Sequence, residues 1–260
     1  MKLSRERIDE FEENGFLILP ELFSTDEVAV IRDAMARVFD RDEPANIREK
    51  KSKLVRTATG LHLRDEAFSR LVRHPRLIEP AKQLRGEDLY VQQCKINVKA
   101  AFEGEQWQWH QDFSTHNQED GVLEPLALNL HIFLDDVNEF NGPLYFFKGS
   151  HKFGPLRNWH DTVSTSWDLW VIEEVDVRRV AETCPLQSMT GKAGTALIFG
   201  DLMLHGSPPN ISPWNRSIFS MIANPVTNAY KKEARPDHQH HRDLSPIQPL
   251  ADDCLLERIS

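Results

Sequence analysis

Two short motifs far apart in the chain place the strongest constraint on its fold. The first is Trp109-His-Gln-Asp112, in which a histidine and an aspartate are separated by one residue. If this segment is a strand, both side chains point to the same face, because alternate residues of a strand share a face. The second motif contains His205, in Leu-Met-Leu-His-Gly-Ser. We therefore expect a fold that brings His110, Asp112 and His205 to one point.

Two imidazole nitrogens and one carboxylate oxygen would form a facial set of three metal ligands, which leaves the opposite coordination positions open. This arrangement is typical of non-haem Fe(II) in enzymes that bind a cosubstrate and O2. A His-X-Asp pair alone also occurs by chance, and each side chain could instead be an ordinary buried residue. The residues after the second histidine favour the metal site, since Gly206, Ser207, Asn210 and then Arg216 follow it.

Arg216 begins a predicted strand, on a face that it shares with Ile218, Ser220 and Ile222. A guanidinium on a mostly apolar face needs an anionic partner, because burying an unpaired charge costs free energy. Guanidinium groups bind carboxylates through two parallel hydrogen bonds. The distal carboxylate of 2-oxoglutarate meets this need, with Ser207 as a further hydrogen-bond donor. The keto-acid end of the same molecule would then bind the metal.

The composition argues against several classes of protein. The chain has 260 residues, of which 40% are hydrophobic and 27% charged, a balance typical of a globular domain. A formal net charge of −9 disfavours binding to nucleic acid or to anionic membranes. No apolar run approaches the roughly 20 residues of a membrane span, and the polar N-terminus lacks a signal-peptide pattern. The widely spaced Cys94, Cys184 and Cys254 favour neither structural zinc nor disulfides, so we expect a cytoplasmic protein.

Residues 1–88 are expected to form a helical layer that contains one short buried strand, at 16–19, ended by Pro20. Ser4 is a candidate N-cap for a first helix, and Ser24 with Glu27 forms a capping box for a second. Residues 65–85 are predicted to be helical, with breaks near the two prolines of this segment. A polar tail follows residue 228, and we expect its histidines, His238, His240 and His241, to be solvated.

Two segments could cover an active site. The charged segment 41–53 is expected to be a mobile loop, either a solvated connection or a lid. The tryptophan-bearing segment 155–190 lacks clean periodicity and resembles an insertion between two strands that could close over a small ligand. The informative strand lies between them, at 89–99. Gln93, Lys95 and Asn97 share one of its faces with Val91 and Lys99, so that this face is either exposed or lines a polar pocket.

The remaining strand predictions indicate a β-sandwich or barrel with a helical layer. Short strands are expected at 124–137, 144–147, 193–199 and 216–223. No repeat or linker divides the sequence. We therefore expect a single domain, with a helical N-terminal layer at about 1–88, a β core at about 89–227, and the polar tail.

Three groups of residues together resemble the phytanoyl-CoA dioxygenase-like superfamily of Fe(II)/2-oxoglutarate oxygenases. They are Trp109–Asp112, Asn141–Leu144 with Gly149–Lys152, and His205–Arg216. The resemblance is greatest to bacterial hydroxylases of small amino acids, the ectoine and leucine hydroxylases of natural-product pathways. It implies a mainly β fold with flanking helices around a double-stranded β-helix core, the jelly-roll or cupin-like architecture. It also implies hydroxylation of a small molecule with Fe(II), 2-oxoglutarate and O2, releasing succinate and CO2.

The resemblance also implies roles for individual residues. His110, Asp112 and His205 fall on the metal ligands and Arg216 on the residue that binds the distal carboxylate of 2-oxoglutarate. One departure concerns His116, which stands where these relatives carry a tryptophan in the substrate pocket. It either packs in a loop or makes the pocket more polar, which argues against ectoine or an aliphatic amino acid as substrate. Further positions are implied for cosubstrate binding, at Lys95, Asn97, Ser207 and Asn129, and for substrate binding, at Gln93 and His116.

Three functions remain open from the sequence. The first is hydroxylation of a free L-amino acid or similar zwitterion, with a polar side chain. The second is oxidation of an acyl-CoA or of a carrier-bound acyl or aminoacyl group, against which the net charge and the absence of a basic cluster argue. The third is a non-catalytic cupin-like binding protein, against which the intact metal ligands and Arg216 argue. A halogenase is disfavoured because Asp112 occupies the metal position that chloride would need, and nothing in the sequence indicates an oligomeric state.

Overall fold

The computed structural model describes residues 1–257, in which helices come first and strands later. The first part contains α1 (Arg5–Asn14), β1 (Phe16–Leu19), α2 (Thr25–Phe39), β2 (Asn46–Arg48), β3 (Val55–Thr59), the 3-10 turn η1 (Leu61–Leu63), α3 (Glu66–Leu71) and α4 (Pro75–Arg85). The middle part contains β4 (Leu89–Lys99), β5 (Trp107–His110), α5 (Asp112–Gln118), β6 (Leu128–Phe133), β7 (Leu144–Phe147) and the 3-10 turn η2 (Ser150–Phe153). The last part contains β8 (Asn158–Asp161), β9 (Leu169–Ile172), α6 (Glu174–Ala181), β10 (Leu186–Met189), β11 (Ala196–Gly200), β12 (His205–Ser207) and β13 (Arg216–Pro225).

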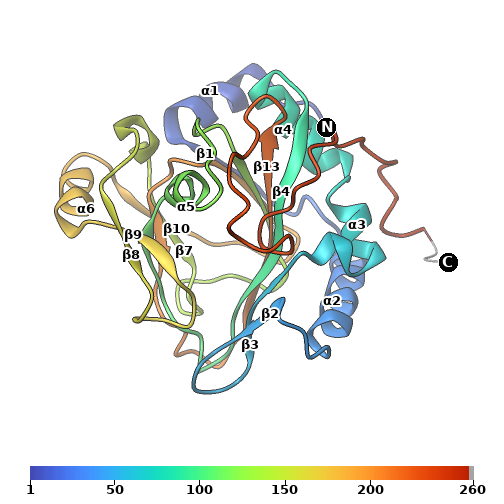
Figure 1. The fold of residues 1–260 in the computed structure, drawn as a ribbon. Coiled ribbons are helices and arrows are strands. Elements are labelled where there is room, and N and C mark those ends of the chain that lie inside the picture. The colour runs from blue at the N-terminus through green and yellow to red at the C-terminus, as the bar shows by residue number, and fades with distance from the viewer. Residues whose placement is uncertain (258–260) are drawn as a thin grey trace.

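Two antiparallel sheets form the body of the molecule (Figure 1). The larger has seven strands in the order β1-β11-β6-β13-β4-β3-β2, and the smaller has four in the order β10-β7-β12-β5. The hairpin β8–β9 continues from the β5 side of the smaller sheet. This is a jelly-roll core with flanking helices, so the predicted fold class is confirmed.

The predicted helix starts are confirmed in detail. The Ser4 hydroxyl accepts a hydrogen bond from the backbone N–H of Arg7, and α1 ends at Gly15, which has a φ of 83°. In α2, the side chains of Ser24 and Glu27 each bind the backbone of the other. These caps satisfy backbone groups that a helix end leaves without partners.

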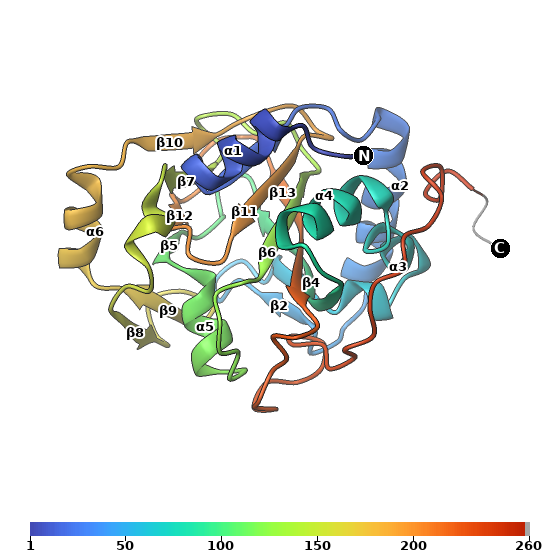
Figure 2. The ribbon, with the colours of Figure 1, turned by 90° about the horizontal axis from the view of Figure 1, so that it is seen from above.

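The alternation of side chains along β6 separates two hydrophobic cores. Leu128, Leu130 and Ile132 point toward α2, α3 and α4, which lie together against the larger sheet (Figure 2). Phe133 joins the core between the two sheets, where the ring of Phe146 packs edge-on against neighbouring phenylalanines. Because alternate side chains of a strand share a face, the polar residues of β6 on the face of Phe133 also lie between the two sheets.

Three strands lie within the N-terminal layer, and of these β1 confirms the predicted strand at 16–19 whereas β2 and β3 were not predicted. β1 pairs with β11, and β2 with β3 extends the larger sheet beyond β4. The residues of β2 fall inside the charged segment 41–53, so this segment is not simply a loop. Segment 155–190 contains β8, β9, α6 and β10.

A β-bulge changes one assignment on β4. Gln93 pairs with Ile222 and Val91 pairs with Ala223, so that Gln92 is an extra residue opposite β13. Because of this extra residue, the side chains of β4 before the bulge point to the faces opposite to those that strict alternation predicts. Val91 therefore joins the hydrophobic core between the larger sheet and the helices. The prediction that Val91 shares a face with Gln93 is therefore wrong.

The C-terminal segment packs against the rest of the protein around its histidines and does not form the solvated tail that we expected. It runs beside β4, where the backbone N–H of His241 binds the Gln92 carbonyl (Figure 1, red). His240 is fully buried, and its Nδ1 lies 3.4 Å from Oδ1 of Asp120. Segment 230–241 therefore docks onto the jelly roll.

Within residues 1–257, no helix is both long and apolar enough to cross a membrane.

Docking of this segment is expected to weaken in acid. Burial lowers the pKa of His240 and of His62 to about 4, from about 6.5 in an unfolded chain. Both rings are neutral above pH 6.5 in either state, so their contribution to stability is complete there. As the pH falls from about 6.5 to 4, the unfolded chain takes up protons that the folded chain does not, and the free energy of unfolding falls.

Thermal melting between pH 7 and pH 4 measures this effect. We expect His240→Gln to have a shallower dependence of Tm on pH than the native protein. The exposed His160 provides the control, since His160→Gln should keep the native dependence. The same slope in all three proteins would contradict the assignment.

Candidate active site

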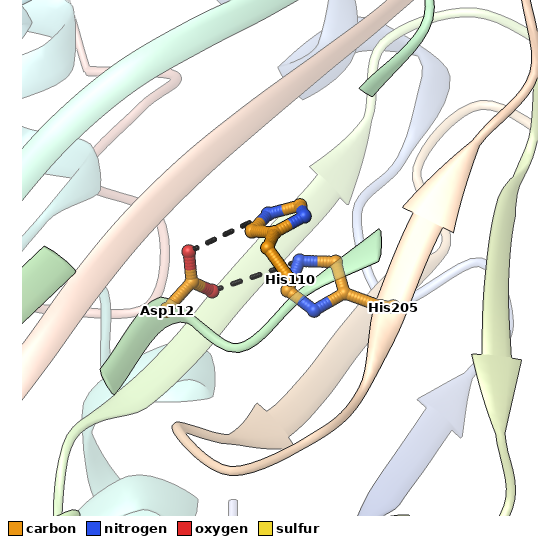
Figure 3. Close-up of side chains that lie close together, drawn as sticks. All are labelled: His110, Asp112 and His205. Atoms are coloured by element: carbon orange, nitrogen blue, oxygen red, sulfur yellow. Dashed lines mark ion pairs between the residues drawn. The ribbon is translucent and has the colours of Figure 1, made fainter. Parts of the chain in front are cut away.

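The three predicted metal ligands meet at one end of the smaller sheet (Figure 3). His110 ends β5 and His205 begins β12, and the two residues are direct antiparallel partners. Asp112 faces both rings, with Oδ1 at 3.9 Å from Nε2 of His110 and Oδ2 at 3.7 Å from Nε2 of His205. One ligand atom from each residue lies within 4.8 Å of the others.

The route by which Asp112 reaches this point differs from our expectation. The strand β5 ends at His110, and Asp112 is the first residue of α5. Gln111 holds the intervening turn, since its amide donates to the carbonyls of Gly154 and Leu202 and its Oε1 accepts from the N–H of Leu156. The convergence is therefore produced by a strand-to-helix turn and not by the pleat of one strand.

The protonation of the three side chains suits a divalent metal. Nδ1 of His110 donates to the Gln108 carbonyl at 2.7 Å, and Nδ1 of His205 donates to the Met203 carbonyl at 2.9 Å. When a ring is neutral, this leaves its Nε2 as the acceptor, and both Nε2 atoms point at Asp112. Burial lowers the pKa of His110 to about 3. For Asp112, burial acts to raise the pKa, but His205 and His110 outweigh it and the pKa is lowered. Neutral imidazoles and an ionised carboxylate are the forms that bind metal, and the set of donors fits Fe(II).

A cavity opens beside these ligands and reaches into the space between the sheets. The polar face of β4 lines it with Gln93, Lys95 and Asn97, so this face lines a pocket and is not solvent-exposed. Nζ of Lys95 donates to Oε1 of Gln93 at 3.1 Å, and Oδ1 of Asn97 accepts from the Thr57 hydroxyl at 3.0 Å. The fifth residue of that face, Lys99, instead binds the carbonyls of Glu105 and Pro208 and is absent from the cavity wall.

Arg216 closes the inner end of the cavity with an unpaired charge. It is 1% exposed, and burial lowers its pKa to about 9. Its Nε and Nη2 donate to the Gly142 carbonyl at 2.9 and 2.7 Å, and Nη2 lies 3.4 Å from the Ser207 hydroxyl. Within residues 1–257 it forms no salt bridge, although Asp135 is near enough to act against the lowering of its pKa, so a bound anion at this end would compensate a buried charge.

Comparison with known proteins places the chain in a family. Residues 11–218 match the model of phytanoyl-CoA dioxygenase (PhyH). The chain belongs to the phytanoyl-CoA dioxygenase family. It is 36% identical to an L-proline trans-4-hydroxylase of Streptomyces griseoviridis over 253 residues, which are 93% of this chain and 94% of that protein. It is 35% identical to an ectoine dioxygenase of Bordetella bronchiseptica, over 98% of this chain and 88% of that protein.

A solved structure of EctD from S. alaskensis with 2-oxoglutarate and 5-hydroxyectoine has the same fold. The TM-score is 0.85 at 28% identity, covering 95% of this chain and 87% of that one. The same protein has also been solved with bound Fe. The resemblance that the sequence motifs suggested, to hydroxylases of small amino acids in this superfamily, is therefore confirmed.

The other residues to which the resemblance assigns roles lie in the wall of the cavity described above, or close to it. Asn129 and His116 line it, and Gln93 and Lys95 lie side by side on the wall. Ser207 contacts Arg216 but does not itself line the cavity. The arrangement brings the predicted residues together, and their roles remain proposals.

Several cavity residues were not found from the sequence. His131 lies on the same face of β6 as Asn129, so the alternation in that strand could have identified it. Trp107 and Trp167 have ring centroids 6.0 Å apart and come from β5 and from the loop between β8 and β9. Arg235 comes from the C-terminal segment, where no sequence pattern indicated a role.

Arg235 is fixed at the outer end of the cavity by Asp120. The guanidinium binds both carboxylate oxygens, with Nε at 2.8 Å from Oδ1 and Nη2 at 2.5 Å from Oδ2. The carbonyl of Asp120 also accepts the backbone N–H groups of Lys231 and Lys232. Asp120 is fully buried, so it attaches the C-terminal segment to the end of α5 and places a cation where the cavity meets solvent.

Proposed function

We propose that this chain, an Fe(II)/2-oxoglutarate-dependent dioxygenase, hydroxylates an unactivated carbon of a free L-amino acid or closely related zwitterion. His110, Asp112 and His205 would hold the Fe(II). Metal, 2-oxoglutarate and O2 together supply the oxidation, with succinate and CO2 as co-products. The observation that carries the proposal is a cavity with the metal ligands in its wall and two further cations beside them, the buried Arg216 and the partly exposed Arg235.

The inner end of the cavity suits 2-oxoglutarate. Arg216 would bind the distal carboxylate, because its fork already has one edge on the Gly142 carbonyl and is otherwise uncompensated. Ser207 contacts this guanidinium and would steady it. Lys95, Asn97 and Asn129 would bind the part of the cosubstrate that lies nearer the metal.

The outer end suits a small molecule with a carboxylate. Arg235 would bind that group, since the Asp120 beside it only orients the guanidinium and leaves the cavity side of the fork free for a ligand. Gln93 and His116 supply hydrogen-bonding groups between this end and the metal. Both named relatives, a proline hydroxylase and an ectoine dioxygenase, act on molecules of this size.

Two segments would exclude water once the substrate is bound. Lys50 donates to the Thr165 carbonyl at 2.8 Å, so the β2–β3 hairpin contacts the β8–β9 loop that carries Trp167. Behind them, the buried Arg56 pairs with Glu105 and stacks over Trp107 at 4.4 Å. We propose that these contacts hold the cover of the active site in place.

The proposal is tested by incubating the purified protein with Fe(II), 2-oxoglutarate, O2 and a panel of substrates. L-Proline, L-leucine, L-glutamine, L-arginine, L-citrulline and ectoine each enter separately. We expect one added oxygen in a polar or cyclic amino acid, matched by succinate and absent with a chelator. Excess chloride should leave the product hydroxylated, because Asp112 occupies the metal position that chloride would need.

Acyl-CoA and carrier-bound aminoacyl substrates complete the panel as the alternative. Oxidation of one of these, with every free amino acid untouched, would contradict the proposed substrate class. A preference for leucine that His116→Trp does not alter would exclude His116 from the pocket and return the substrate to the aliphatic class.

A further inference from the structure

A buried histidine–aspartate pair lies in the cavity wall, apart from the metal ligands and from the two arginines. His116 stands one helical turn after Asp112 on α5, and Asp201 follows the end of β11. Nδ1 of His116 lies 2.9 Å from Oδ1 of Asp201. Each residue is 1% exposed, and His116 forms part of the cavity surface.

The negative charge of the Asp201 carboxylate is compensated by His116. Within residues 1–257, neither of its carboxylate oxygens accepts a hydrogen bond, so the ion pair with Nδ1 of His116 is what compensates its charge. Arg85 is the cation nearby, but it donates to the carbonyls of Leu126 and Ala127. The carboxylate therefore keeps a proton on Nδ1, and Nε2 is the nitrogen of His116 that remains for a ligand.

The cavity wall lacks another carboxylate for a cationic group. It contains three cations, Lys95, Arg216 and Arg235, and a single carboxylate, Asp112, which belongs to the metal site. Asp120 is fully buried and already binds Arg235. A zwitterion whose carboxylate lies at Arg235 would bring in an ammonium for which the cavity wall offers no carboxylate outside the metal site, unless Asp201 acts through His116.

We propose that Nε2 of His116, with Asp201 behind it, accepts a hydrogen bond from the protonated amino or imino group of the substrate. This inference rests on the proposed function, because it needs a small zwitterion in this cavity. Asp201 raises the pKa of His116 against the opposing effect of burial, so the free pair attracts one positive charge. When the substrate is bound, its ammonium group supplies this positive charge in place of the proton on Nε2. Asp201 is thus a positioning residue, and His116 selects molecules that carry an amine.

The test compares ligands that differ only at the α-nitrogen. L-Proline, L-leucine and L-glutamine are each paired with the analogue in which oxygen replaces that nitrogen. Dissociation constants are measured by calorimetry without O2, on protein loaded with Fe(II) and 2-oxoglutarate. For the amino acid that the protein hydroxylates, we expect the native protein to bind the amine about 100-fold more tightly than its oxygen analogue, as for a hydrogen bond to a charged group.

Two variants separate the roles of the pair. His116→Trp keeps an aromatic ring but removes the acceptor, and should reduce the ratio at least about tenfold. Asp201→Asn should reduce it in the native background and have no further effect on it in His116→Trp, because Asp201 acts only through His116. Asp176→Asn is the matched control, since it removes another buried carboxylate, on α6, that pairs with Arg157 and Arg179. Unchanged 2-oxoglutarate affinity shows that each variant is folded.

The outcomes distinguish the inference from the proposed function. A hydroxylated amino acid whose oxygen analogue binds equally well, or whose ratio survives in His116→Trp, overturns the inference and leaves the function standing. If 2-oxoglutarate binds but no free amino acid binds or reacts, the proposed function fails and the inference fails with it. A ratio that falls in both single variants but not in Asp176→Asn supports it.

Discussion

His205→Ala is expected to lose iron binding and to lower kcat by at least about 10³-fold, since a catalytic metal supplies several kcal/mol of transition-state stabilisation. His205 is the direct strand partner of His110, and its Nε2 points at Asp112. The variant therefore leaves two of three protein ligands and opens a fourth metal position. Iron content after anaerobic loading and succinate formation measure the two effects.

His151→Ala provides the control for this substitution. His151 binds the Glu12 carbonyl on α1 and lies outside the cavity wall, so its loss should leave iron occupancy unchanged. Full iron occupancy and turnover in His205→Ala would show that another residue completes the metal site.

Arg216→Ala is expected to raise the KM for 2-oxoglutarate by about 30-fold or more, which corresponds to the roughly 2–5 kcal/mol lost when one partner of a buried charge pair is removed. The guanidinium is anchored on the Gly142 carbonyl and has no anionic partner in residues 1–257. A carboxylate bound there would lose its only bidentate donor. Steady-state kinetics at saturating amino acid measure the change.

Two further variants show whether geometry or charge matters at this position. Arg216→Lys keeps the charge but not the planar fork, and should recover only part of the affinity. Arg157→Ala removes an exposed arginine that pairs with Asp176 and should leave the KM unchanged. An unchanged KM in Arg216→Ala would assign the anion site to another cation of the cavity, such as Lys95.

Local patterns in the sequence determined the elements on which the site is built. The caps at Ser4 and Ser24 are confirmed, because capping depends on residues three positions apart. The alternation along β4 also placed Gln93, Lys95 and Asn97 on one face, as far as the bulge at Gln92, but left open whether this face is exposed or lines a pocket. Residue type and spacing also indicated the metal ligands, but only together with the residues that follow His205, since a His-X-Asp pair alone also occurs by chance.

Only the tertiary structure decided how distant segments complete the cavity. Arg235 reaches its outer end because Asp120, more than a hundred residues earlier, binds the C-terminal segment. His240 is buried by the same docking, although its surroundings in the sequence are polar. Asp201 becomes the partner of His116 because β11 ends beside α5. Such pairs depend on the packing of segments that share no local pattern, because a side chain's burial and charge partners are set by contacts in space and not by its neighbours along the chain.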